Sequence, residues 1–132
     1  MTVLLVGNSA NIASLATELE GADLRVERWP EAPSAGGAAE EVAAIARELR
    51  KFETALDHDA PHAVLLASDS SAALAAVLVA TKLGAPVGRI GLSGEDSAGA
   101  NGDLIRHLAD AALAPEPAAI VDWVRDTYTP RG

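Results

Sequence analysis

Residues 59–90 place a short apolar run, a turn, an apolar helix and a second strand-like run in direct succession. Ala63–Ala67 has the length and composition of a strand that is buried on both faces of a sheet, and Val87–Ile90 reads as the next strand. Ser71–Leu83 is apolar almost all round, which indicates a buried helix, and Gly84 follows where a helix commonly ends. Two strands joined through a helix form a parallel pair, so this segment predicts a parallel α/β fold.

Strand and helix patterns alternate along the rest of the chain. Runs typical of strands occupy Thr2–Val6, Leu24–Trp29 and Ala111–Ala114. Apolar residues recur at helical spacings of three and four at Ile12, Leu15 and Leu19, and again at Val42, Ile45, Leu49, Phe52 and Leu56. Shorter helices are expected near Asp103–Ala109 and Glu116–Arg125, with Gly21 just past the end of the first helix and a frayed tail at residues 127–132.

This alternation predicts one Rossmann-like, three-layer α/β/α domain over residues 1–132, with a parallel sheet of about five strands and helices on both faces. Domains of this kind commonly have the strand order 2-1-3-4-5. They bind ligands at the carboxyl ends of strands 1 and 3, where the winding reverses. We therefore expect residues 7–11 to lie beside residues 69–71 at a ligand-binding crevice.

The composition argues against several classes of partner. A net charge of −9 disfavours nucleic acid and anionic membranes, because both are bound largely through Lys and Arg. The longest apolar run, residues 72–80, is too short to span a bilayer, and no signal peptide precedes the first strand, so we expect a cytoplasmic protein. Cysteine is absent, which excludes a thiolate metal site, and the three histidines lack ligand-like spacing, so we expect no metal site. We also expect no cofactor.

Two turns at the predicted crevice have a functional and a plain structural interpretation. Gly7, Asn8 and Ser9 could cradle a phosphate through backbone N–H groups, but the segment has neither G-x-G-x-x-G nor a Walker pattern and also suits an ordinary strand-to-helix turn. Ser70 and Ser71 could contact a ligand or cap the following helix. For Asp69, capping and a functional role are equally well supported.

Acidic residues also gather in or beside the Gly-rich segment of residues 91–102. Glu95, Asp96 and Asp103 could serve as general acids or bases, and they equally suit a solvated loop and a helix cap. His58 and His62 flank a Pro-containing turn and are expected at the surface, and His107 is expected to be structural.

Three short stretches carry a resemblance to a known family: Pro61–Leu66, Ser68–Ser71 and Ala85–Ile90. They are similar to P-D-x-V-L-V-x-G-D-T-T/S and, after an Ala-rich helix, I-P-V-x-H-V-E-A-G-L-R, in the N-terminal domain of the non-hydrolysing UDP-N-acetylglucosamine (UDP-GlcNAc) 2-epimerases. Leu104–Asp110 looks like the family's E-x-N-R-R-L-x-D helix, and Ala114–Pro115 resembles its F-A-P-T. The similarity covers roughly residues 46–125.

The resemblance implies two Rossmann-like domains with the active site between them, as in GT-B glycosyltransferases. The family reaction eliminates UDP and adds it back with C2 inverted, with carboxylates as acid and base. By this resemblance Asp69 occupies the catalytic Asp position, and Asp103 falls on or next to a family Glu. The Glu of H-V-E-A-G-L is absent, and residues 7–11 replace the Arg-containing G-T-R-P-E loop. The second domain, which supplies most UDP contacts and a catalytic His, is expected to be missing.

Two functional hypotheses follow from this comparison. In the first, the chain is a stand-alone epimerase-like domain that is not catalytic by itself and binds a nucleotide-sugar-like ligand or a partner that completes the site. In the second, it is an isomerase, lyase or epimerase for a small substrate, active as a homo-oligomer through Asp69 with Glu95, Asp96 or Asp103. The partner is expected to be a second copy, in a homodimer, or a protein that provides the second domain.

Overall fold

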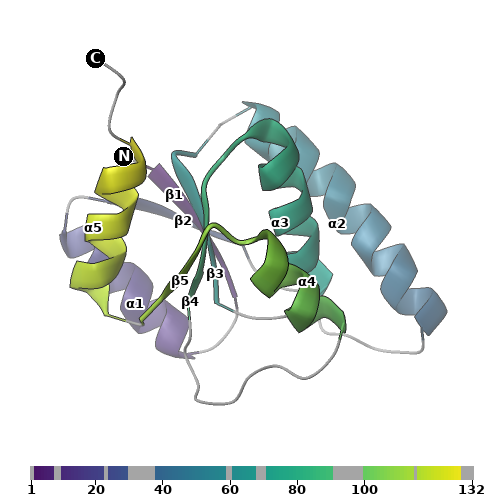
Figure 1. Ribbon diagram of the computed structural model, residues 1–132, viewed down its shortest axis with the longest axis horizontal. Coiled ribbons are helices and arrows are strands. Elements are labelled where there is room, and N and C mark those ends of the chain that lie inside the picture. Colours follow the sequence, from purple (N-terminus) through teal and green to yellow (C-terminus); the bar gives the residue numbers. More distant parts are fainter. Residues whose placement is uncertain are drawn as a thin grey trace.

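The computed structural model describes residues 2–7, 10–22, 24–29, 38–58, 61–67, 71–90, 100–114 and 116–128. Within these ranges, strands and helices alternate without exception (Figure 1). The strands are β1 (Thr2–Val6), β2 (Arg25–Trp29), β3 (Ala63–Leu66), β4 (Val87–Ile90) and β5 (Ala111–Leu113). The helices are α1 (Ala10–Gly21), α2 (Ala38–His58), α3 (Ser71–Leu83), α4 (Ala100–Leu108) and α5 (Pro117–Tyr128).

The described strands form one parallel five-stranded sheet in the order β2-β1-β3-β4-β5, which confirms the predicted topology. Val6 at the end of β1 is in register with Trp29 on β2 and with Leu66 on β3. Leu66 is in turn in register with Arg89 on β4. The carboxyl ends of these strands therefore lie at one side of the sheet, which we call the carboxyl edge.

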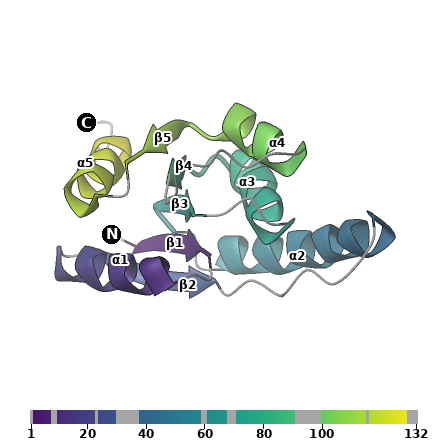
Figure 2. The same ribbon diagram turned by 90° about the horizontal axis from the view of Figure 1, so that it is seen from below.

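Helices cover both faces of the sheet, as the alternation predicts. Figure 2 shows α1 and α5 on one side of the strands and α2, α3 and α4 on the other. Alternate residues of β1 follow this division: Leu4 and Val6 belong to the core under α2, α3 and α4, whereas Val3 and Leu5 belong to the core under α1 and α5. The inner strands are thus apolar on both faces, which explains why they read as continuous hydrophobic runs.

Helix α3 is the buried helix that the sequence predicts. Its residues from Ala72 to Val77 are all buried, because α3 lies between α2 and α4 against the sheet (Figure 2). Its alanines permit this close approach on several sides. The helix ends at Gly84, whose φ of 79° is the left-handed conformation that glycine adopts without a Cβ clash. The N–H of Ala85 donates to the carbonyl of Ala80 at 2.9 Å, the bond of a Schellman motif.

The bounds of several helices differ from the predicted ones. Gly21 is the last residue of α1 instead of the residue after it, and the bond that closes this helix runs from the N–H of Leu24 to the carbonyl of Leu19 at 3.2 Å. Helix α5 continues through Thr127 and Tyr128, which were expected to fray. The Thr127 hydroxyl donates to the carbonyl of Val124 at 2.9 Å and so extends the bonding of the last turn.

The apolar stripe of α2 is buried only in part. Phe52 and Leu56 are buried against α3 and the sheet, whereas Val42 is 66% exposed. The cause is length, since α2 has 21 residues and α3 has 13. The amino-terminal turns of α2 consequently reach past α3 (Figure 1).

Candidate functional site at the carboxyl edge

The carboxyl ends of β1 and β3 are neighbours from which the chain departs in opposite directions. The N–H of Ala67 donates to the carbonyl of Val6 at 3.0 Å, and this bond continues the pairing of β3 with β1. Helix α1 follows β1 onto one face of the sheet, and α3 follows β3 onto the other (Figure 2). This is the topological switch point at which open α/β sheets bind their ligands, and it lies where the sequence predicts it.

The described backbone positions some of the predicted site residues. Gly7 lies at the end of β1, and its N–H donates to the carbonyl of Trp29 at 3.5 Å. Ser71 is the first residue of α3. Both therefore lie at the carboxyl edge, but Ser71 is described through its backbone alone, and the ligand contacts expected of both residues stay predictions. Asn8, Ser9, Asp69, Ser70 and Glu95 lie outside the described residues, so the roles expected of them remain predictions.

Asp103 lies inside α4, three residues after the helix begins at Ala100. It is therefore not the cap at the start of this helix, and the cap interpretation is wrong for this residue. Helices α3 and α4 pack side by side, and both lead into the amino ends of the strands that follow them. Their first turns therefore lie toward the carboxyl edge, and this places Asp103 on the same side of the sheet as Ser71.

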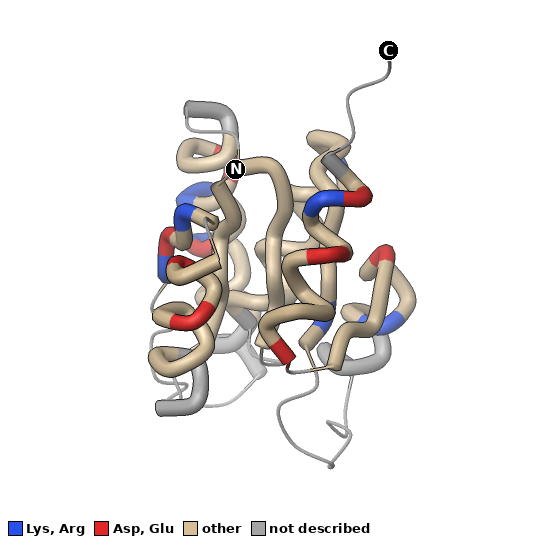
Figure 3. The backbone as a smooth tube through the Cα atoms, turned by 90° about the vertical axis from the view of Figure 1, so that its left-hand side faces the viewer, with Lys and Arg blue, Asp and Glu red and all other residues tan. Residues whose placement is uncertain are grey.

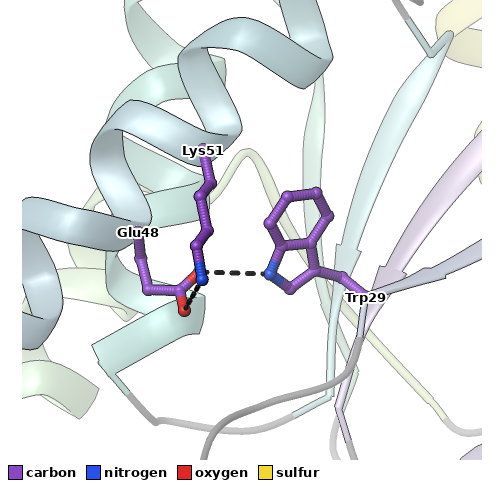
Figure 4. A network of polar contacts seen from close by, with 3 residues as sticks. All are labelled: Trp29, Glu48 and Lys51. Atoms are coloured by element: carbon purple, nitrogen blue, oxygen red, sulfur yellow. Dashed lines mark hydrogen bonds and ion pairs between the residues drawn. The ribbon is translucent and has the colours of Figure 1, made fainter.

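A polar cluster at the end of β2 was not predicted from the sequence (Figure 4). The indole N–H of Trp29 donates to Oε2 of Glu48 at 3.2 Å, and Nζ of Lys51 lies 3.8 Å from Oε1. Glu48 is only 8% exposed, and these two partners satisfy a carboxylate whose burial would otherwise be costly. The Trp29 ring also stacks on Phe52, with a centroid distance of 4.1 Å. The cluster fixes α2 against the carboxyl end of β2.

The opposite side of the sheet, where the amino ends of the strands lie and which we call the amino edge, holds polar residues with structural roles. The N–H of Thr2 donates to Nδ1 of His62 at 2.8 Å, and the N–H of His62 donates to the carbonyl of Thr2 at 2.7 Å. His62 is thus half-buried and tied to β1, more tightly held than the surface position expected for it. Asp110 makes a similar pair of bonds with Val87, through Oδ2 at 2.7 Å and through its own N–H at 2.8 Å.

His107 is exposed on α4, and the side chain of His58 is not among those described. No group of three or more His, Asp or Glu among the described residues could hold a metal ion. None of the described helices combines the length and the apolar character that a membrane crossing requires.

Comparison by sequence finds no relative for the chain: no family model matches, and no curated protein matches significantly. Comparison by structure finds UDP-GlcNAc 2-epimerases. The MnaA–UDP co-structure from S. aureus superposes with a TM-score of 0.70 and 16% identity, over 97% of this chain and 41% of that chain.

Two further solved structures match equally well. The UDP-GlcNAc 2-epimerase from Methanocaldococcus jannaschii has a TM-score of 0.67 and 20% identity, over 96% of this chain and 42% of that chain. The enzyme from Neisseria meningitidis bound to UDP-GlcNAc has a TM-score of 0.69 and 18% identity, over 98% of this chain and 44% of that chain. The chain therefore has the fold of one part of the UDP-GlcNAc 2-epimerases and spans less than half of their length.

Proposed function

We propose that the chain is a non-catalytic binding module that receives a nucleotide-sugar-like ligand at its carboxyl edge. The rest of the active site would come from the part of the epimerase fold that these residues do not span. The observation that carries this proposal is the coverage of the structural matches. Nearly all of the chain superposes on epimerase structures, but it accounts for only 41% of the S. aureus protein and 44% of the N. meningitidis protein.

The ligand class follows from the position of the switch point and from two of the matching structures. Ligands of open α/β sheets lie at the carboxyl ends of the strands, here at Gly7 and Ala67. The S. aureus structure contains UDP and the N. meningitidis structure contains UDP-GlcNAc. A nucleotide sugar at the carboxyl edge is therefore the ligand that the fold supports best.

The proposal that the chain is not catalytic is supported by residues of the family motifs that the sequence lacks. By the resemblance to the epimerase motifs, Asp69 occupies the position of the family's catalytic Asp, and Asp103 falls on or next to a family Glu. The remaining Glu of the family motif is missing, and residues 7–11 contain no Arg. The family reaction uses carboxylates as both acid and base, and with this Glu and the loop Arg missing we propose that the remaining carboxylates do not suffice for turnover.

Incubation of the purified chain with UDP-GlcNAc tests this proposal. We expect no release of UDP and no formation of N-acetylmannosamine, whereas the same sample should bind UDP-GlcNAc reversibly in a calorimetric titration. Steady turnover by the chain alone would refute the non-catalytic role. Absence of any binding up to millimolar ligand would refute the nucleotide-sugar assignment.

The acidic residues of the segment after β4 motivate a second candidate. In it, Asp69 acts with Glu95, Asp96 or Asp103 on a small substrate across the interface of a homo-oligomer. Asp69→Asn should then abolish whatever isomerase or lyase activity a substrate screen detects, while Asp110→Asn, at the opposite edge, should leave it intact. An unchanged rate in Asp69→Asn would exclude Asp69 from the chemistry.

For completion of the site we propose a partner, either a second copy of the chain or a protein that provides the second domain. Large apolar side chains are exposed on three helices, Val42 on α2, Leu83 on α3 and Leu104 on α4, and association could cover them. Sedimentation at high protein concentration measures self-association directly. A strictly monomeric chain would leave the separate protein as the only partner under this proposal.

A further inference from the structure

Arg89 is a charged residue among the apolar central strands of the sheet. It is the third residue of β4, and the remaining residues of the three central strands β1, β3 and β4 carry no charge. Charged residues elsewhere lie mostly on the outer elements, as Figure 3 shows for the described chain. The central strands of a parallel sheet are covered on both faces. A cationic side chain there loses water contacts, which hydrogen bonds or an opposite charge must replace.

The register places Arg89 at the carboxyl edge. Its neighbours across the sheet are Leu66 on β3 and Ala112 on β5, and only Ile90 follows it within β4. Leu66 belongs to the core under α3 and α4, so residue 89 is on the same face. Arg89 is half-buried, and its neighbour Ala112 is exposed. This face of the sheet is therefore open to solvent beside Arg89.

The segments at the carboxyl ends of β1, β3, β4 and β5 contain no further Lys or Arg beside Arg89. Residues 7–11, 67–71, 90–94 and 114–117 follow or end strands β1, β3, β4 and β5, and none of them is Lys or Arg. On the face under α3 and α4, an anionic ligand at the switch point would therefore find Arg89 as the basic residue of these strand ends. Arg28, near the end of β2, is in register with Leu5 and so lies on the opposite face. In a chain with a net charge of −9, one fixed cation has a large effect on where an anion binds.

From this placement we propose that Arg89 binds the phosphate groups of the ligand and makes the site selective for phosphorylated ligands over neutral ones. This inference rests on the proposed nucleotide-sugar function and assigns a residue to its anionic part. The guanidinium group suits the task because it forms two parallel hydrogen bonds to a phosphate in a fixed planar geometry. Arg89 also takes part in an interaction within the chain, which a bound phosphate would share or replace.

The test compares Arg89→Gln with Arg25→Gln, using UDP and inorganic pyrophosphate as probes in calorimetric titrations. Arg25 is the matched control, because it is exposed on β2 and in register with Thr2 at the opposite edge of the sheet. We expect Arg89→Gln to raise the dissociation constants of both probes by roughly tenfold to a hundredfold, the loss typical of a charge-assisted hydrogen bond. Arg25→Gln should stay within about twofold of the wild type.

Arg89→Lys separates binding from folding. It keeps the charge and loses the bidentate geometry, so we expect a folded protein with an affinity between those of the wild type and Arg89→Gln. If Arg89→Gln does not fold, Arg89→Lys decides: weaker UDP binding supports the inference, and an unchanged dissociation constant overturns it. Equal affinity of the wild type and Arg89→Gln for UDP overturns the inference and leaves the proposed function intact. A wild type that binds neither UDP nor UDP-GlcNAc overturns both.

Discussion

Gly88 on β4 is the position where the packing of α5 against the sheet can be tested most sharply. A Cβ atom at this residue would lie 2.7 Å from Cδ1 of Leu113 and 3.1 Å from Cζ3 of Trp123. Carbon atoms in contact normally lie about 3.5–4.0 Å apart. Gly88→Ala therefore requires Leu113 on β5 to change its side-chain conformation and Trp123 on α5 to move by a few tenths of an ångström.

The size of the effect follows from two opposing terms. Overpacking of this kind costs about 1–3 kcal/mol. Replacing glycine by alanine restricts the unfolded chain and returns about 0.4–1 kcal/mol. The Leu113 contact can relax because it involves the tip of a half-buried side chain on a short edge strand, but the rigid indole of Trp123 cannot adapt in this way. We expect a net loss of stability of about 1–2 kcal/mol for Gly88→Ala.

Equilibrium unfolding in urea, followed by circular dichroism, measures this loss. With a urea dependence of about 2 kcal/mol per molar, the midpoint of Gly88→Ala should fall by roughly 0.5–1 M. Gly21→Ala is the matched control, because a Cβ atom at residue 21 would have no neighbour within 4 Å and alanine favours helices. Its midpoint should stay the same or rise. A Gly88→Ala protein as stable as the wild type would show that α5 does not pack on β4 as described.

Further substitutions test the helix end, the amino edge and the buried carboxylate, each by the same urea unfolding. Gly84→Ala should lose about 1–2 kcal/mol because its φ of 79° is unfavourable for any residue with a Cβ; no loss would contradict the left-handed helix end. His62→Ala should lose about 1 kcal/mol through the bond from the N–H of Thr2, and an unchanged midpoint would argue against that bond. Glu48→Ala should lose about 1–3 kcal/mol and shift the fluorescence of Trp29, whereas Glu48→Gln, which keeps an acceptor, should lose less.

Most of the fold could be predicted because the spacing of hydrophobic residues within each segment indicates whether that segment is a strand or a helix. The apolar runs of β1 and β3 and the all-round apolar α3 each indicate their own structure, and the short connections permit few strand orders. The start of α4 was not predicted, because Ala100, Asn101 and Gly102 continue a Gly-rich segment with weak helix preference. Burial of Ile105 against the sheet core favours the helix all the same.

The candidate site could be located from the sequence but not completed. The switch point follows from strand order alone, so its position beside Gly7 and Ala67 could be predicted. The bond between Trp29 and Glu48 could not, because it joins two elements whose relative placement is decided by tertiary packing. The role that we propose for Arg89 likewise follows only from the register of β4 with β3, since a single arginine in a strand has no distinctive sequence pattern.

The central claim is that the carboxyl edge binds a nucleotide sugar that the chain alone does not convert. A titration of the ¹⁵N-labelled chain with UDP-GlcNAc, followed through the amide resonances, tests it most directly. We expect saturable shifts at Gly7, Ala67 and Arg89, small changes at His62 and Asp110 on the opposite edge, and no signals from N-acetylmannosamine in the same sample. Absence of shifts, shifts confined to the amino edge, or the appearance of product would contradict the claim.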